Sequence, residues 1–499
     1  MSLKASLSKP YAQWVTKRAM RHACDAVATQ DKVLRMLMRS AAGTAFGKEH
    51  GFGEVTDHAS LAKAVPLRDY EGFRPYIERV VCGERDVLWP GLPLYMCKTS
   101  GTTSGAKYIP ITRQSLPNHI HSARNALLAY ISRTGNTAFV DGKMIFLQGS
   151  PVLDRKGAIP SGRLSGIVAN HVPGYLQRNR LPTFATNSIT DWETKVEAVV
   201  TETMKEDLRL ISGIPAWTQM YFERLLARTG KRNVKEVFPH FSLFVYGGVN
   251  YTPYRDRMRT LIGGDVDSIE LFPASEGFIA YQDRHDEEGL LLVVDNGIYY
   301  EFIPQVPPVS GPASAVQRRV PLADVRTGIN YALVLHTNAG LWGYGIGDTV
   351  RFVSLSPPRI VVTGRTKHFT SAFGEHVIAE EVEGALKEVM AVMPCEVSEF
   401  TVAPRTAPPD GELPYHEWFI EFAAPPADLA RFADLLDSAV VKRNVYYKDL
   451  IAGKVLRPLR ITPVRRGGFT AWMKARGMND AQSKVPRLAN DRKYVEGLI

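Results

Sequence analysis

The chain has 499 residues, of which 45% are hydrophobic and 22% charged, and its net charge is +10. This length predicts more than one domain, and the composition is typical of a globular protein, which excludes a fibrous or disordered chain. The basic residues are spread along the sequence and no zinc-finger or RNA-binding motif is present. The charge therefore favours a basic enzyme surface over a nucleic-acid-binding protein.

The first segment, residues 11–42, has apolar residues at steps of mostly three and four, which predicts helices that bury one face. The apolar positions are Trp14, Val15, Ala19, Ala23, Val27, Val33, Leu34, Leu37 and Met38. The basic positions are Lys17, Arg18, Arg21 and His22. A basic group of this kind is typical of a solvated helix face.

Two absences bear on where the protein acts. Met1 to Pro10 lacks the apolar run of a secretory signal, and no other run approaches the roughly 20 apolar residues of a membrane span. The four cysteines are Cys24, Cys82, Cys97 and Cys395. Because they are far apart, we expect buried or half-buried free thiols, which fit a reducing compartment. Together with the two absences, this predicts a cytoplasmic protein.

Beyond about residue 60, helical periodicity alternates with short apolar runs, which predicts an α/β architecture. We expect strands at residues 92–97, 143–147, 241–246, 268–272, 290–294, 298–302 and 331–336. We expect helices beginning at Ser115 and covering residues 190–211 and 217–227.

The pattern restarts near Gly364-Arg365, where we place a domain boundary. It separates a large domain, residues 1–365, from a smaller C-terminal α/β domain, residues 366–499. In the smaller domain we expect helices at 380–390, 428–447 and 469–476, strands at 418–422 and 455–464, and a surface loop at 402–414.

A glycine- and hydroxyl-rich segment, residues 98–107, follows a predicted strand and ends in Lys107. Glycines let the backbone approach a ligand closely, while hydroxyl and N–H groups donate to phosphate oxygens and lysine adds positive charge. The candidate phosphate-binding residues are Thr99, Ser100, Gly101, Thr102, Thr103, Ser104 and Gly105. The spacing differs from the mononucleotide P-loop, and composition alone is equally typical of a polar turn.

The sequence T-S-G-T-T-S-G followed by Lys107 resembles the phosphate loop of the adenylate-forming superfamily. Further stretches resemble one branch of it, the plant auxin- and jasmonate-responsive acyl acid–amido synthetases and their bacterial relatives. They are residues 46–52, 65–71, 83–84, 88–91 and 212–215. The resemblance runs from about residue 45 to the C-terminus. It implies a large N-terminal adenylate-forming domain of β-sheets and packed helices, and a smaller, mobile C-terminal domain that closes over the site.

The resemblance also implies that the site binds ATP and Mg²⁺. In the segment Phe272-Pro273-Ala274-Ser275-Glu276, it places Phe272 near adenine and Ser275 near the acyl carboxylate or phosphate, with Pro273 and Ala274 also among the cofactor-binding residues. Glu276, with Thr102 of the phosphate loop, would ligate Mg²⁺, a hard cation that favours carboxylate and other oxygen ligands. A helix beginning at Ser275 is the structural alternative.

Four further positions follow from the same resemblance. Gly248, Val249 and Asn250 would lie beside adenine and the acyl group, although a simple turn explains them almost as well. Asp348 would accept hydrogen bonds from the ribose hydroxyls, with Gly345 standing where an arginine is usual. Arg365 would reach the ribose or phosphate, or else make a surface ion pair. Lys484 would neutralise charge on the α-phosphate.

We therefore predict a ligase that activates a carboxylic acid as its acyl-adenylate and transfers the acyl group to an amine or amino acid. The alternatives are an acyl-CoA ligase or ester-forming enzyme, which shares the first half-reaction, and a catalytically silent nucleotide-binding protein. The expected partners are small molecules, without nucleic acid or a transmembrane segment. The sequence does not identify the acid, the acceptor or the oligomeric state.

Overall fold

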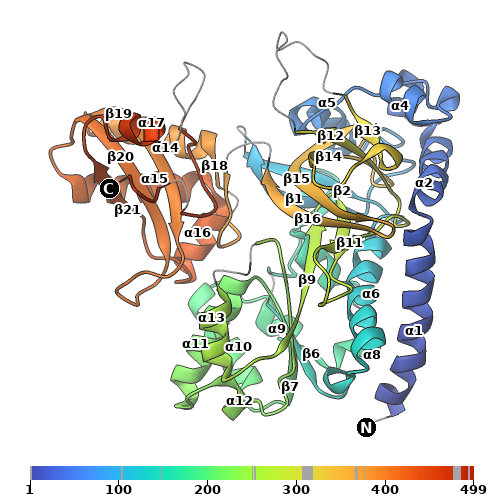
Figure 1. The fold of residues 1–499 in the computed structure, drawn as a ribbon, viewed down its shortest axis with the longest axis horizontal. Helices are drawn as coiled ribbons and strands as arrows, with labels where there is room; N and C mark the ends of the chain where they lie inside the picture. The colour runs from blue at the N-terminus through green and yellow to red at the C-terminus, as the bar shows by residue number, and fades with distance from the viewer. Residues whose placement is uncertain are drawn as a thin grey trace.

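The computed structural model describes residues 3–102, 105–147, 149–172, 174–249, 251, 254–305, 318–365, 369–375, 377–475, 485–492 and 495–498. The fold is mixed α/β, with a large N-terminal domain and a smaller C-terminal domain, which confirms the predicted fold class (Figure 1). No helix in these residues is both long enough and apolar enough to span a membrane.

Two helices, α1 (Leu3–Cys24) and α2 (Ala26–Ala41), lie along one edge of the large domain (Figure 1). α1 packs small residues such as Ala12 and Val15 against α6 (Leu116–Thr134). The prediction that Trp14 and Val27 belong to the buried face is wrong, since they are 60% and 45% exposed. Successive residues of a helix are about 100° apart, so Trp14 points away from the surface that Val15 covers.

Short helices follow, α3 (Ala45–Glu49), the 3₁₀ turn η1 (Phe52–Glu54), α4 (His58–Ala64) and α5 (Tyr70–Val81). Two of them begin at aspartate caps. Asp57 accepts a hydrogen bond from the Ser60 N–H, and Asp69 accepts one from the Gly72 N–H. Such caps satisfy N–H groups that the first helical turn leaves unpaired.

A long sheet forms the centre of the large domain, with the strand order β13-β12-β14-β15-β16-β11-β10-β9-β8-β7-β3-β6 among the described residues. Its parallel part comprises β3 (Lys143–Phe146), β6 (Arg180–Leu181), β7 (Leu208–Ser212), β8 (Leu243–Gly247) and β9 (Asp267–Ala274). Its antiparallel part comprises β10 (Gly277–Tyr281), β11 (Leu290–Leu292), β12 (Ile298–Pro304), β13 (Val320–Pro321), β14 (Asn330–Thr337), β15 (Tyr344–Leu355) and β16 (Pro358–Arg365).

Helices flank the parallel part: α10 (Trp192–Thr203), α11 (Pro215–Thr229), α12 (Val234–Val237) and α13 (Arg255–Ile262). One predicted element here is wrong, because residues 190–211 form α10 and then β7 rather than one long helix. The chain turns after Thr203, and the apolar residues of 208–211 enter the sheet. Runs such as Leu-Ile fit a helix or a buried strand equally well, so periodicity alone does not separate them.

A second, smaller sheet has the order β2-β1-β5-β4. Its strands are β1 (Tyr95–Thr102), β2 (Gly105–Ile111), β4 (Asp154–Lys156) and β5 (Ile159–Gly162). The helix α7 (Leu164–Ala169) follows β5. The cysteine prediction is partly wrong: Cys97 of β1 is buried and Cys395 half-buried, but Cys24 and Cys82 are exposed; all four are free.

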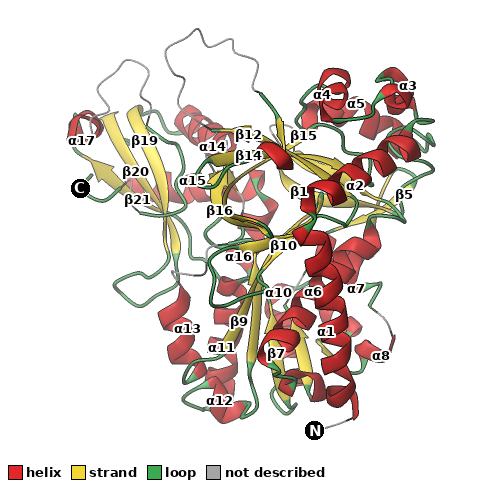
Figure 2. Ribbon diagram, turned by 45° about the vertical axis from the view of Figure 1, so that its right-hand side comes forward, coloured by secondary structure: helices red, strands yellow, loops and turns green. Residues whose placement is uncertain are grey.

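The C-terminal domain contains a three-stranded sheet, β19 (Glu396–Arg405), β20 (Tyr415–Ala424) and β21 (Arg460–Val464), with β20 in the middle (Figure 2). Its helices are α14 (Ala379–Val392), α15 (Leu429–Arg443), α16 (Val445–Ala452) and α17 (Gly468–Ala475), and the short strands β17 (Phe369–Thr370) and β18 (Val377–Ile378) pair with each other.

Three expectations for this domain are corrected. The predicted strand 455–464 is shorter, because only Arg460–Val464 pair with β20. The predicted helix 428–447 is divided at Asn444. The Asn444 side chain accepts a hydrogen bond from the Tyr447 N–H and so caps the start of α16. The predicted loop at 402–414 is strand up to Arg405, because residues 402–405 pair with residues 415–418 of β20.

Candidate active site

The glycine- and hydroxyl-rich segment forms the end of the β1–β2 hairpin. Thr99 pairs with Lys107, and Thr102 pairs with Gly105 across the ladder. The sequence predicted a strand that ends at Cys97 followed by a loop. The structure instead continues β1 beyond Cys97, because the two ends of the segment pair with each other as neighbouring antiparallel strands. Lys107, half-buried, is therefore held at a fixed register opposite Thr99.

Part of the predicted site lies outside the described residues, namely Thr103, Ser104, Asn250 and Lys484. The structure describes only the backbone of a second group, Ser100, Gly101, Thr102, Gly105 and Arg365. The roles expected of these side chains stay predictions.

Ser275 and Glu276 form the two-residue turn between β9 and β10, whose closing pair is Ala274 with Gly277. A helix beginning at Ser275 is therefore wrong, since the chain reverses and continues as a strand. Both turn side chains are half-buried. The turn presents a hydroxyl and a carboxylate side by side at the end of a hairpin.

One side-chain contact joins this turn to the β1–β2 hairpin. The Cys97 thiol donates to Ser275 Oγ at 3.3 Å, between residues 178 positions apart in the sequence. Burial raises the pKa of the Cys97 thiol to about 12; the Ser275 hydrogen bond opposes this and the charge of Glu276 adds to it. A thiol that stays protonated is a poor nucleophile and a suitable hydrogen-bond donor.

The carboxyl ends of three parallel strands, β7, β8 and β9, lie at the same edge of the large sheet. In open α/β sheets, ligands bind outside this edge. Gly247 ends β8, and a Cβ there would lie only 2.4 Å from the Leu271 carbonyl oxygen, so only glycine fits. Gly248 follows with φ +81°, and nothing lies within 4 Å of where its Cβ would be. Bare backbone of this kind leaves room for a flat ligand.

The predicted nucleotide-binding residues on β9 face different ways. Phe272 is only 8% exposed and belongs to the main hydrophobic core, whereas Pro273 is exposed. Successive residues of a strand point to opposite faces. This alternation favours Pro273 as a ligand contact over Phe272, whose face Ala274 shares; Ala274 and Val249 are half-buried.

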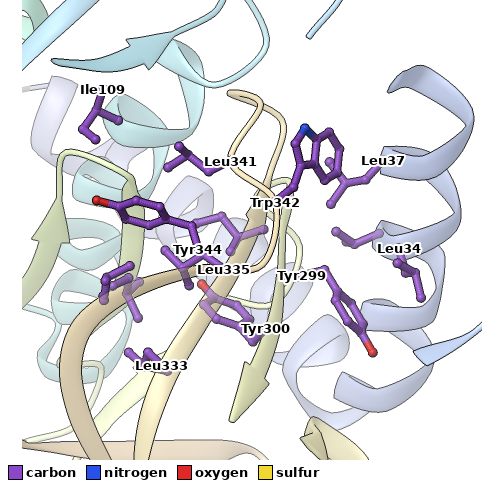
Figure 3. Close-up of a cluster of buried hydrophobic side chains, with 14 of the residues drawn as sticks. Leu34, Leu37, Ile109, Tyr299, Tyr300, Leu333, Leu335, Leu341, Trp342 and Tyr344 are labelled. Atoms are coloured by element: carbon purple, nitrogen blue, oxygen red, sulfur yellow. The ribbon is translucent and has the colours of Figure 1, made fainter. Parts of the chain in front are cut away.

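Asp348 lies in β15 directly opposite Arg365 of β16, at the point where β16 ends and the chain continues toward the C-terminal domain. Four residues earlier, Tyr344 belongs to the same buried cluster as Ile109 of β2 (Figure 3). The strand that carries Asp348 and the hairpin that carries Lys107 thus both contribute side chains to one hydrophobic cluster. Asp348 itself is half-buried.

Gly345, which departs from the expected arginine, is fixed by its backbone. Its N–H donates to the Arg68 carbonyl oxygen at 2.9 Å. A Cβ at this position would meet its nearest neighbours at 3.8 Å, an ordinary contact distance. The strand therefore tolerates a side chain here, and the glycine is not required by packing.

The C-terminal domain contacts this region through α16, which sequence reasoning missed. Arg163, between β5 and α7, forms an ion pair with Asp449, and its guanidinium carbon lies 4.3 Å from the ring centroid of Tyr446. Tyr446 also hydrogen-bonds the Thr99 side chain, and burial raises the pKa of its hydroxyl above the usual value. Nothing in the sequence around Tyr446 marks it, because its partners lie some 280 or more residues earlier.

The donor set fits ATP with Mg²⁺ rather than a dedicated metal cage. Within the part of the chain that the structure describes, no group of three or more His, Cys, Asp or Glu residues is placed to hold a metal ion. Mg²⁺ in nucleotide enzymes is usually held by one or two carboxylates together with phosphate oxygens and water. Glu276 would supply one such carboxylate. It follows Ser275, whose hydroxyl contacts Cys97 of the β1–β2 hairpin.

Comparison with protein families gives three consecutive matches. The GH3 family N-terminal domain matches residues 16–178, the central domain 291–365 and the C-terminal domain 379–493. Together these matches cover most of the chain and follow the order of the family.

Among curated relatives, the chain is 22% identical to indole-3-acetic acid-amido synthetase GH3.3 of Arabidopsis thaliana, over 92% of this chain and 88% of the relative. It is also 22% identical to jasmonoyl–L-amino acid synthetase GH3.5 of Oryza sativa subsp. japonica, over 93% of each. The solved structure of AtGH3.15 acyl acid amido synthetase in complex with 2,4-DB superimposes with a TM-score of 0.61 at 17% identity, covering 97% of this chain and 95% of that one. The last comparison shows that the two proteins share a fold.

Proposed function

The chain belongs to the GH3 family, and on this premise we propose that it is an acyl acid–amido synthetase, which activates a carboxylic acid with ATP and joins the acyl group to an amine. Its full-length curated relatives carry amido synthetase names. The structural observation that supports the proposal best is the hydrogen bond from Cys97 to Ser275, which joins the β1–β2 hairpin to the turn that carries Glu276.

The first step forms the acyl-adenylate. A carboxylate oxygen of the acid bonds to the α-phosphorus of ATP, while the bond from that phosphorus to the bridging oxygen breaks and pyrophosphate leaves. Such transfers depend on positioning and charge neutralisation more than on a protein nucleophile. Lys107 and the backbone of residues 99–105 would hold the phosphates. Asp348 would accept hydrogen bonds from the ribose hydroxyls. Mg²⁺, held by Glu276 with Thr102, would neutralise phosphate charge.

The second step forms the amide. The amine nitrogen attacks the acyl carbonyl carbon, the bond to the AMP phosphate oxygen breaks, and the nitrogen gives up a proton. We propose that the C-terminal domain, residues 366–499, moves between the two steps and carries Lys484 toward the α-phosphate. The partly exposed ion pair of Arg163 with Asp449 supports this, because such pairs break at little cost.

The test is isotope exchange between labelled pyrophosphate and ATP, with Mg²⁺ and a panel of aryl, indolyl and fatty acids. The best acid is then offered with amino acids, and the amide and AMP are quantified. We expect exchange with at least one acid and amide formation with at least one amine. Exchange with none of the acids would overturn the proposal. So would consumption of coenzyme A thiol without amide, which indicates an acyl-CoA ligase.

Substitution sharpens the assignment of residues. Lys107→Ala and Glu276→Gln should each lower the exchange rate about 10²- to 10³-fold, the usual effect of removing one group that stabilises developing charge. Lys156→Ala is the matched control. This lysine lies in the same small sheet, with its amine 4.6 Å from the Tyr108 ring centroid, and belongs to none of the motifs. An equal loss in the control would indicate damage to the sheet rather than a lost phosphate contact.

A further inference from the structure

The outward face of α1 carries three exposed apolar side chains in one row. Leu7 is 61% exposed, Tyr11 43% and Trp14 60%. Their spacing of four and three residues places them on one side of the helix. The Tyr11 and Trp14 rings stack with centroids 6.2 Å apart. Large apolar side chains gathered in water mark an interaction surface more often than scattered ones do.

Basic side chains continue the same row at both ends. Lys4 precedes it by three residues, and Arg18 and Arg21 follow at steps of four and three; all three are exposed. Lys9 and Lys17 add two more positive charges, and the sequence of α1 from residue 3 to 24 contains no Asp or Glu. α1 is thus a helix of one charge sign with an apolar strip in the middle of its exposed side.

The fold does not explain these side chains. The opposite side of α1 is already packed, with Ala12, Val15 and Ala23 in one cluster with residues of α6. Figures 1 and 2 show α1 at the margin of the large domain, away from the C-terminal domain. The apolar row also lies before residue 16, where the match to the GH3 N-terminal domain begins.

The charge and the shape of the surface identify its occupant. A second copy would bring one acid-free basic helix against another, so like charges would oppose self-association. The row is the convex side of a helix, which needs a groove in a protein partner but only displaced headgroups in a lipid surface. Tyr, Trp and basic residues on one helix face are typical of helices that lie in the membrane interface.

We propose that α1 docks the protein reversibly on an anionic lipid surface. Leu7, Tyr11 and Trp14 insert among the headgroups, while Lys4, Arg18 and Arg21 pair with lipid phosphates. The proposal is independent of the catalytic assignment, because α1 carries none of the predicted site residues.

The test is co-sedimentation of the full chain with vesicles of phosphatidylcholine alone or mixed with phosphatidylglycerol, at low and high salt. We expect sedimentation only with the mixed vesicles, and its loss at high salt. Trp14→Ser should weaken vesicle binding about tenfold, and Arg18→Glu with Arg21→Glu by more than that. Pyrophosphate exchange without vesicles should be unchanged in each variant.

Phe184→Ser provides the matched control, since Phe184 is equally exposed at 60% but lies on α9 (Phe184–Asn187). It should bind mixed vesicles like the unmodified chain. Three results would overturn the proposal: no sedimentation with mixed vesicles, an equal loss in the Phe184 variant, or a dimer by light scattering that Trp14→Ser dissociates. The last result would assign the surface to a second copy.

Discussion

The core around Trp342 and the junction at Arg163 hold the molecule together in different ways. Trp342 is fully buried (Figure 3). Its indole N–H donates to the Leu88 carbonyl oxygen at 3.0 Å, and the Phe52 ring lies edge-on, with the ring centroids 4.7 Å apart. Arg163 and Asp449 form their ion pair while 31% and 37% exposed. The contacts of Trp342 are buried from solvent, whereas the ion pair of Arg163 with Asp449 is partly exposed.

The difference indicates which parts of the site are fixed. The β1–β2 hairpin, the turn with Glu276 and the strand with Asp348 all belong to the large domain. The core cluster that includes Trp342 also contains Ile109 of that hairpin and Tyr344 of that strand. Close-packed interiors resist deformation, so these groups keep their mutual positions. The partly exposed ion pair at Arg163 costs little to break, which suits the proposed movement of the C-terminal domain.

The largest effect is expected from Trp342→Ala, which empties the core. We expect the free energy of unfolding to fall by about 3–5 kcal/mol, because a large buried ring is replaced by a cavity. Urea denaturation followed by circular dichroism measures it. Trp14→Ala is the control: with Trp14 60% exposed, its loss should change stability by about 0.5 kcal/mol or less. Equal losses of stability in both variants would contradict the expectation that the buried Trp342 stabilises the fold more than the exposed Trp14.

A somewhat smaller effect is expected from Glu301→Gln in the same core. Glu301 is fully buried; its Oε2 accepts from His336 Nε2 at 2.8 Å and pairs with Arg319 at 2.9 Å. Burial disfavours its charge, but the hydrogen bond and charges of its partners outweigh burial and hold the pKa well below the usual value. Removing one member of a buried charged group costs about 3 kcal/mol at neutral pH.

The pH dependence of this effect follows from the direction of the shift. A carboxyl with a lowered pKa in the folded state adds stability above the unfolded pKa of about 4.3, and this is lost as pH falls toward the folded value. The stability difference between the unmodified chain and Glu301→Gln should therefore shrink below about pH 4.3. A difference that stays constant down to pH 3 would contradict the assignment.

The smallest effect on stability is expected from Arg163→Ala, less than about 1 kcal/mol, because the pair it breaks is partly exposed. Amide hydrogen exchange in α16 should nevertheless become faster, since Tyr446 and Asp449 lose their partner. Asp449→Asn should do the same, and combining the two should add little further. Arg257→Ala is the control. It breaks a similar exposed pair with Glu223 inside the large domain and should leave exchange in α16 unchanged.

Sequence reasoning located six of the twelve described strands of the long sheet, and none of the hairpins. It predicted β8, β9, β12 and β14 because each is a short apolar run bounded by turn residues. It missed the pairing of residues 99–102 with 105–107, whose polar composition suggests a loop. It also joined α10 to β7, since short apolar runs fit both helix and strand.

The sequence by itself determined the α/β class and the position of the glycine- and hydroxyl-rich segment, because both are carried by residues that are neighbours in the chain. Only the tertiary structure brought Cys97 against Ser275, 178 residues away, and Arg163 against Asp449, 286 residues away. It also decided that Trp14 faces water while Val15 is buried. Which side of a helix is covered depends on what packs against it, and periodicity carries no information about that partner.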